Sequence, residues 1–161
     1  MRKLLLTGLI LLLAGCGIQP AGVTDTGKAP TGLAPGVTLY FVDTQQRLRP
    51  QLRRSGNLGT VTQALLLLFK GPGEADGSRL HTEIPETTVA AQVDTATPGV
   101  IEIRVPFDVE ELSPRAVDQI VCTALGVHRQ SGGAKQTKVR IAFTHGPEAA
   151  SQRLRGCPLL P

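Results

Sequence analysis

The chain is poor in aromatic residues, histidine and cysteine. Its 161 residues include one Tyr, four Phe and no Trp, with three His and three Cys. Proteins that hold nucleic acid combine a concentrated basic face with aromatic stacking platforms, so this composition argues against a nucleic-acid partner. The net charge is +4. Arg2 and Lys3 belong to an N-terminal segment that we expect to be removed as a signal peptide, as argued below. Its removal leaves a net charge of 4 − 2 = +2.

The sequence patterns of common catalytic and metal sites are also missing. His81, His128 and His145 lie far apart, outside the short ligand spacings of zinc sites. No Gly-x-Ser-x-Gly or Ser-x-x-Lys is present. Gly71-Pro72-Gly73 lacks the lysine and hydroxyl of a phosphate loop. We therefore expect no metal, no cofactor and no enzyme activity.

Two charged clusters have alternative interpretations. Asp108, Glu110 and Glu111 resemble paired catalytic carboxylates, but they precede an expected helix, whose dipole favours negative charge at its start. Four arginines lie close together at Arg47, Arg49, Arg53 and Arg54. These arginines form either a solvated loop rim or a contact with anionic lipid heads or wall polymers beside a membrane anchor.

The N-terminal segment contains about ten mostly apolar residues, from Leu4 to Leu13, after Arg2 and Lys3. This length is typical of the hydrophobic region of a secretion signal. An uncleaved membrane span is disfavoured, because ten residues of helix rise only about 15 Å and a bilayer core needs about 20 residues. An ordinary secretory signal with a chance cysteine at the cleavage point is a second alternative.

Leu13-Ala14-Gly15-Cys16 resembles the lipobox of bacterial lipoproteins. The resemblance implies that residues 1–15 are a signal peptide and that the Cys16 thiol carries a diacylglyceryl group. Two acyl chains hold a protein stably on a membrane, whereas one holds it only marginally. We therefore expect a lipid-anchored, extracytoplasmic protein on the outer face of the cytoplasmic membrane.

Lipidation of Cys16 would leave Cys122 and Cys157 as an even pair. An even pair in an exported protein predicts a disulfide. We expect Cys122 on the flank or outer side of a helix, where a cysteine in the C-terminal tail can reach it. The alternative is a reactive thiol at Cys122, which no neighbouring residue in the sequence supports.

The mature chain divides into three parts. Residues 16–36 are rich in Gly, Pro, Thr and Ala and predict a lipidated N-terminus with a flexible tether. Residues 37–147 predict one small domain, and residues 148–161 predict a C-terminal tail tied to that domain.

Periodicity predicts an α+β, sandwich-like domain. Strands are expected over 37–42, 87–93, 100–105 and 138–143, and helices over 57–70 and from Pro114 onward. A further short strand over 48–54 should lie at an edge, because it contains Pro50. The order strand, helix, strand, strand, helix, strand is satisfied by two helices that cover one face of a mixed or antiparallel sheet.

Several motifs in this order resemble the GerMN domain, a sporulation and spore-germination family widespread in bacterial lipoproteins. The motif residues are Leu39-Tyr40-Phe41-Val42-Asp43, Ala64-Leu65, Gly71-Pro72, Leu80, Ile84-Pro85, Ala116, Gln119-Ile120-Val121, Thr123-Ala124-Leu125, Val139-Arg140-Ile141 and Gly146. Family members often carry two copies, whereas this chain carries one. The general pattern includes neither Cys122 nor Cys157, so the resemblance does not support the disulfide.

The resemblance implies a non-catalytic binding or assembly module of the cell envelope, with a fold similar to ring-building modules of sporulation and secretion machines. The expected partners are the membrane through Cys16, an envelope protein or a second copy, and cell-wall polymers. The alternative is a small enzyme or accessory factor acting on wall polymers. A solute-binding protein is disfavoured, because the chain is too short for two lobes.

Overall fold

A computed structural model describes residues 36–73 and 79–160. The predicted signal peptide, Cys16 and most of the predicted tether lie outside the described residues. Ten elements follow one another: β1 (Val37–Asp43), β2 (Leu48–Arg53), α1 (Val61–Phe69), β3 (Leu80–His81), β4 (Gln92–Asp94), β5 (Val100–Arg104), α2 (Pro114–Gln130), β6 (Lys138–Ala142), α3 (Glu148–Gln152) and β7 (Leu154–Arg155).

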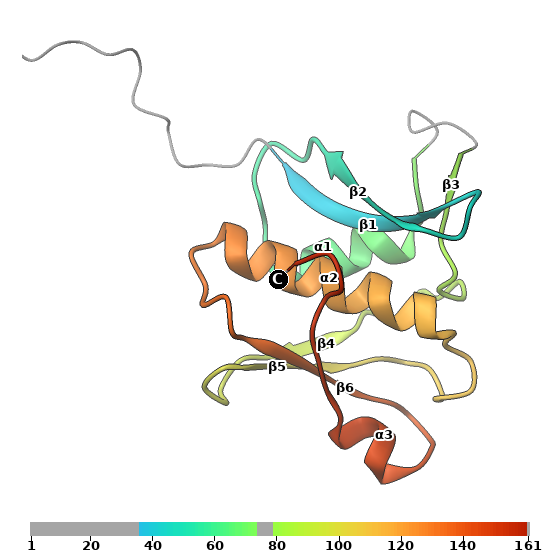
Figure 1. Cartoon of the computed structure of the whole chain (residues 1–161), viewed down its shortest axis with the longest axis vertical. Coiled ribbons are helices and arrows are strands. Elements are labelled where there is room, and N and C mark those ends of the chain that lie inside the picture. Colours follow the sequence, from blue (N-terminus) through green and yellow to red (C-terminus); the bar gives the residue numbers. More distant parts are fainter. Residues whose placement is uncertain (1–35, 74–78, 161) are drawn as a thin grey trace, which may run out of the picture. The chain divides into compact units, whose positions relative to one another are not determined.

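The strands form two sheets, with α1 and α2 between them (Figure 1). Sheet A is antiparallel, in the order β2-β1-β3. Sheet B is mixed, in the order β4-β5-β6-β7, and its central pair β5 and β6 is parallel. The expected α+β class with a mixed or antiparallel sheet is confirmed. The second sheet and the short α3 are additions that periodicity did not predict.

Helix α2 carries the core because it is buried on most of its circumference. It contacts β1, α1 and β6. Ten of its residues are buried, namely Ala116 and all those from Gln119 to Val127. Ser113 caps its start by accepting a hydrogen bond from the N–H of Ala116 (3.0 Å), as the sequence predicts. Gly126 lets β1 approach closely, since a Cβ there would lie 3.3 Å from the Tyr40 ring.

Two buried polar side chains of α2 hold the free edge of β1. The Thr123 hydroxyl accepts a hydrogen bond from the backbone N–H of Tyr40 (3.2 Å), and the Gln119 amide donates one to the Tyr40 carbonyl (2.9 Å). Gln119 also accepts a hydrogen bond from the N–H of Glu83, just after β3 (2.9 Å). Helix α2 thus takes the place of a neighbouring strand beside the centre of β1, whereas β3 pairs only with Val42 and Asp43 at its end.

Opposite this edge, β1 pairs with β2, and Pro50 lies across from Tyr40. Because the N–H and C=O of Tyr40 are directed at α2, the residue paired with it would direct its own N–H out of the sheet. Proline, which has no N–H, fits that position. The prediction that Pro50 marks an edge strand is confirmed.

The first helix begins later than predicted. We expected a helix over 57–70 capped by Asn57, whereas α1 begins at Val61 and Thr60 is its cap. The Thr60 hydroxyl accepts from the Gln63 N–H (3.2 Å), and the Gln63 side chain accepts from the Thr60 N–H (2.9 Å). This reciprocal capping box sets the start of the helix at Thr60, and its Thr-x-x-Gln spacing is visible in the sequence.

The predicted strand over 87–93 is also wrong in its extent, because β4 is only Gln92–Asp94. The Thr87 hydroxyl accepts a hydrogen bond from the N–H of Val89 (3.0 Å). Such local side-chain bonds compete with strand pairing, so the chain turns before it joins β5. The predicted hairpin connection over 95–99 is present between the antiparallel strands β4 and β5.

The C-terminal segment adds β7 to sheet B and reaches α2 through a disulfide between Cys122 and Cys157. Cys122 is fully buried in the complete fold. The half-cystine of the tail lies against it and is itself buried, so the tail covers this part of the helix. The two bonded cysteines are 35 positions apart in the sequence, and the bond closes the loop between them.

Replacing Gln119 tests the link between α2 and β1. Gln119→Leu should lower the free energy of unfolding by about 2–5 kcal/mol, because it removes the partners of the buried Tyr40 carbonyl and of the Glu83 N–H. Denaturant unfolding measures the difference. Gln130→Leu, in the same helix, is the matched control: its amide donates to the Thr38 hydroxyl of β1 in a solvent-exposed bond, so the loss of unfolding free energy should stay below about 0.5 kcal/mol. Equal losses of unfolding free energy for the two variants would contradict the role given to Gln119.

Breaking the disulfide should loosen the tail. Cys157→Ser should lower the free energy of unfolding by about 3–4 kcal/mol on the chain-entropy model for a loop of this size. Alkylation of the denatured, unreduced protein should leave Cys122 and Cys157 unmodified, as read by peptide mass spectrometry. Full alkylation of both residues would show that the bond is absent from the purified protein.

Candidate interaction site

The outer face of sheet B presents two rows of side chains to solvent. Because the strands are in register, residues paired across neighbouring strands project from the same face. The first row is Asp94, Glu102, Arg140 and Leu154, and the second is Gln92, Arg104 and Ala142. The opposite face carries Ile101, Ile103, Val139 and Ile141, all buried in the core. The sequence predicted this wet face from the alternation over 100–105.

Polar contacts within these rows link neighbouring strands, and the face remains exposed to solvent. The Arg140 guanidinium donates to the Glu102 carboxylate (2.6 Å), and Arg104 donates to the Gln92 side chain (3.1 Å). A shallow depression of about 240 Å³ lies between β4, β5 and the end of β6. A flat face with fixed cross-strand pairs can receive a protein surface by charge and shape complementarity.

The edge of sheet B at β4 is open to pairing. Within the described part of the chain, β4 pairs only with β5. The residues before β4 are largely exposed, and Val89 is 57% exposed. A groove of about 410 Å³ lined by Val89, Gln92 and Phe143 lies across the neighbouring ends of β4, β5 and β6. An open edge with an adjacent apolar groove suits the addition of an extended segment from another chain.

A second groove, of about 430 Å³, runs between α2, Phe143 and β7. Burial raises the pKa of Asp118 there, against the opposing charges of Arg115 and Arg155. Burial, followed by the charge of Arg153, lowers the pKa of Arg155, against the opposing charge of Asp118. Arg155 also lies 5.8 Å from the Phe143 ring centre. Sequence reasoning missed this pair, because no pattern shows that β7 brings Arg155 near α2.

The three histidines do not converge. His128 Nε2 lies 3.0 Å from the buried Thr137 hydroxyl, beside the C-terminal end of α2. His145 Nδ1 lies 2.7 Å from an Asp108 carboxylate oxygen in an exposed pair. His81 belongs to β3 in the other sheet. Over 36–73 and 79–160, no three His, Cys, Asp or Glu side chains group to hold a metal ion.

The candidate carboxylates next to α2 organise a loop. The Glu111 carboxylate accepts a hydrogen bond from the N–H of Asp108 (2.7 Å), and Asp108 in turn contacts His145. The first turn of α2 contains no acidic residue, because Ser113 and Pro114 separate the carboxylates from it. The carboxylates thus lie just before the helix, as expected, and local hydrogen bonds hold Asp108 and Glu111 there.

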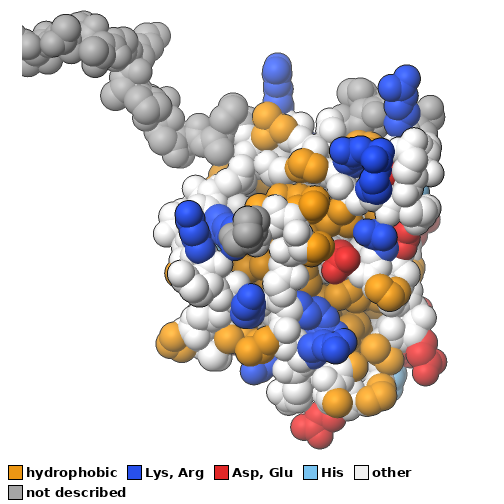
Figure 2. Space-filling view, viewed as in Figure 1, with side chains coloured by type: hydrophobic (Ala, Val, Ile, Leu, Met, Phe, Trp, Pro, Cys, Tyr) orange, Lys and Arg blue, Asp and Glu red, His pale blue; other side chains and the backbone are white. Residues whose placement is uncertain are grey.

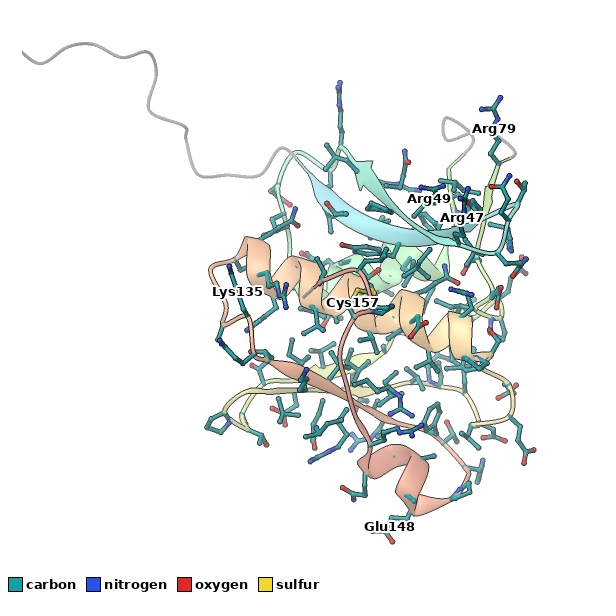
Figure 3. The ribbon with its side chains drawn as sticks, in the orientation of Figure 1. Arg47, Arg49, Arg79, Lys135, Glu148 and Cys157 are labelled. Atoms are coloured by element: carbon teal, nitrogen blue, oxygen red, sulfur yellow. A yellow bond between two sulfur atoms is a disulfide. The ribbon has the colours of Figure 1, made fainter. Side chains whose placement is uncertain are left out.

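The arginine cluster is divided by its contacts. Arg47 and Arg49 both bind one oxygen of Asp43 at the end of the β1–β2 hairpin (3.1 and 2.8 Å; Figure 3). Burial raises the pKa of Asp43, but the N–H of Arg47, the two guanidinium groups and the N–H of Gln45 outweigh it and hold the pKa well below its usual range. Two of the four arginines thus stabilise a hairpin turn.

Several residues that carried the family resemblance belong to the structural frame. Gln119 and Thr123 hold β1 through hydrogen bonds. Gly71 accepts the left-handed conformation after α1, with φ +78°. Gly146, with φ +138°, packs so closely on Val109 that a Cβ would lie 2.5 Å from it. These motif residues therefore specify the architecture, whereas most of the outward rows of sheet B lie outside the motif.

No helix within the described parts of the chain is long and apolar enough to span a membrane. Comparison with curated proteins and with solved structures finds no match. A comparison with family models finds one match, Germane, described as sporulation and spore germination, over residues 38–142. The match runs from β1 to the end of β6 and includes α2. The chain therefore belongs to the Germane family of sporulation and spore germination domains.

Proposed function

We propose that this protein is a lipid-anchored, extracytoplasmic binding and assembly module of the cell envelope, without catalytic activity. The observation that carries this proposal is the open face of sheet B together with its free β4 edge. A surface of this kind can pair with an envelope protein or with a second copy of the chain. Membership of the Germane family is consistent with a role in sporulation.

The anchor in this proposal is the lipid on Cys16. Support comes from the order of the N-terminal sequence: two cations, an apolar stretch from Leu4 to Leu13, and small residues before the cysteine. The residues from 17 to the start of β1 would then connect the lipid to the domain. This arrangement keeps the binding surface near the membrane and raises its local concentration against other envelope proteins.

A second candidate function is an enzyme or accessory factor acting on wall polymers. The groove between α2 and β7 favours it, because a carboxyl group of raised pKa beside a cleft is a feature of many catalytic acids. Asp118 is the group that such chemistry would use. Against it, Arg155 also donates to the Ala150 carbonyl of α3 (3.2 Å), which indicates a structural role in joining β7 to α3.

Removal of the lipidation site tests the anchor. Cys16→Ala should move the protein from the membrane fraction to the soluble extracytoplasmic fraction, because the diacylglyceryl group has no other attachment point. Immunoblots of fractionated cells measure the distribution. Cys157→Ser is the matched control, since it removes another cysteine and should leave the protein on the membrane. An unchanged membrane fraction for Cys16→Ala would contradict the lipoprotein proposal.

Site-specific photo-cross-linking in intact cells tests the interaction surface. A photoreactive phenylalanine analogue in place of Gln92, on the β4 edge, should give discrete cross-links to a protein partner or to a second copy. The same analogue in place of Lys135, an exposed residue on the loop after α2 (Figure 3), should give few. Identical products from both positions would contradict the assignment to sheet B. Products consisting only of wall fragments would favour the enzyme alternative.

A further inference from the structure

A third groove, of about 310 Å³, lies between α1 and the loop that precedes it. It is separate from sheet B. Leu58 from the loop and Leu66 and Leu67 from α1 line it, and Val37 at the start of β1 forms part of its wall. Lys70, at the end of α1, lines the groove as well.

The apolar side chains of this groove are unusually exposed for their helix. Leu66 is 38% exposed, and Leu58 and Leu67 are partly buried. Gln63, Leu66, Leu67 and Lys70 follow the i, i+3, i+4, i+7 spacing and so share one side of α1. The core already occupies another side of the helix, with Ala64, Leu65 and Leu68. Leu58 and Leu67 pack partly against the core and Leu66 is exposed, which gives a partly exposed apolar strip bordered by a cation. Such a strip is typical of an interaction surface.

Charge is distributed unevenly between the two parts of the domain. Residues 36–81 contain six Lys and Arg and three Asp and Glu, a net charge of 6 − 3 = +3. Residues 82–160 contain eight Lys and Arg and nine Asp and Glu, a net charge of 8 − 9 = −1. Figure 2 shows several Lys and Arg side chains over β1 and β2. The part of the domain that holds the groove is therefore the basic part.

Among these cations, Arg54 and Lys70 lie nearest to the groove along the chain. Arg54 directly precedes Ser55, which lines the groove, and it is exposed. Lys70 lines the groove and is exposed. Arg53, by contrast, donates to the Gly71 carbonyl (3.2 Å) and so helps to hold β2 against the end of α1.

The position of the chain start brings this groove toward the membrane. Val37 lines the groove, so the segment that follows Cys16 joins the domain at the groove wall. The segment 17–36 has 20 residues. The groove is thus on the part of the domain that the chain enters on its way from Cys16.

We propose that the groove of Leu58, Leu66 and Leu67, with Arg54 and Lys70 at its rim, is a membrane-contact surface that lays the domain against an anionic lipid bilayer. The leucines would insert at the level of the acyl-chain boundary, and the cations would meet the anionic head groups. This inference rests on the proposed lipid anchor. Sheet B contributes no residue to this groove and so remains open to partners.

Vesicle sedimentation tests the surface without the lipid. The protein is the mature chain, residues 16–161, carrying Cys16→Ser to prevent acylation. It should sediment with vesicles of phosphatidylcholine containing phosphatidylglycerol, and not with vesicles of phosphatidylcholine alone. Raising the salt from 0.1 M to 0.5 M should release most of it, because screening weakens the attraction of the cations.

Variants localise the binding. Arg54→Glu with Lys70→Glu should weaken binding to phosphatidylglycerol vesicles at least 25-fold, since each cation near an anionic surface contributes about fivefold. Lys138→Glu with Arg153→Glu is the matched control: it makes the same charge change on exposed residues in sheet B and just before β7, and should weaken binding much less. Leu66→Ser should weaken binding without altering the melting temperature.

Three results would overturn the proposal: no sedimentation with anionic vesicles, equal losses for the groove and control variants, or binding to isolated wall material in place of vesicles. None of these bears on the anchor, because release of the Cys16→Ala protein from cell membranes is measured separately. A failed vesicle experiment with a successful fractionation would leave a lipoprotein whose domain does not touch the bilayer.

Discussion

The structure depends on a pair of hydrogen bonds between the interior of one helix and the backbone of one strand. Gln119 and Thr123 stand one helical turn apart and bind the C=O and the N–H of the same residue, Tyr40. Hydrophobic contacts are not directional, so a buried helix could slide or rotate among apolar neighbours. Two bonds to a single peptide position remove that freedom. They also satisfy backbone groups at a strand edge that would otherwise be buried without partners.

This arrangement explains which parts of the fold the sequence could predict. The apolar stripe of α2 and the alternation over 100–105 and 138–143 identify elements whose burial follows a simple period. The division into two sheets depends on the buried polar residues Gln119 and Thr123 of α2. A search for apolar periodicity counts such residues as interruptions of the apolar stripe of the helix. Sequence patterns also placed Pro50 at an edge, but the Thr60 capping box went unused and the turn at Thr87 interrupted an apparent strand. Strand β7 has two residues, too few for any periodic signal.

The candidate surfaces were predictable to different degrees. The polar alternation in β5 indicated a solvated sheet face, and the structure extends it across β4 and β6 by register. The arginines after β1 were grouped correctly in sequence, yet two of them are held by Asp43 in a hairpin turn. The proximity of Asp118 and Arg155 required the path of the tail, which long-range contacts determine. Family motif residues such as Gln119 and Gly146 build the frame, so partner choice should reside in outward residues outside the motif.

The disulfide has a consequence for the order in which the molecule is completed. Cytoplasmic thiols are kept reduced, and an exported chain meets oxidants only after it has crossed the membrane. The short β7 contributes two residues to sheet B and is fastened to the core through Cys157. For a chain exported as proposed, completion of this edge of the sheet would be coupled to arrival outside the cell membrane. The redox state of that compartment would then decide whether the last strand of the domain is bonded to α2.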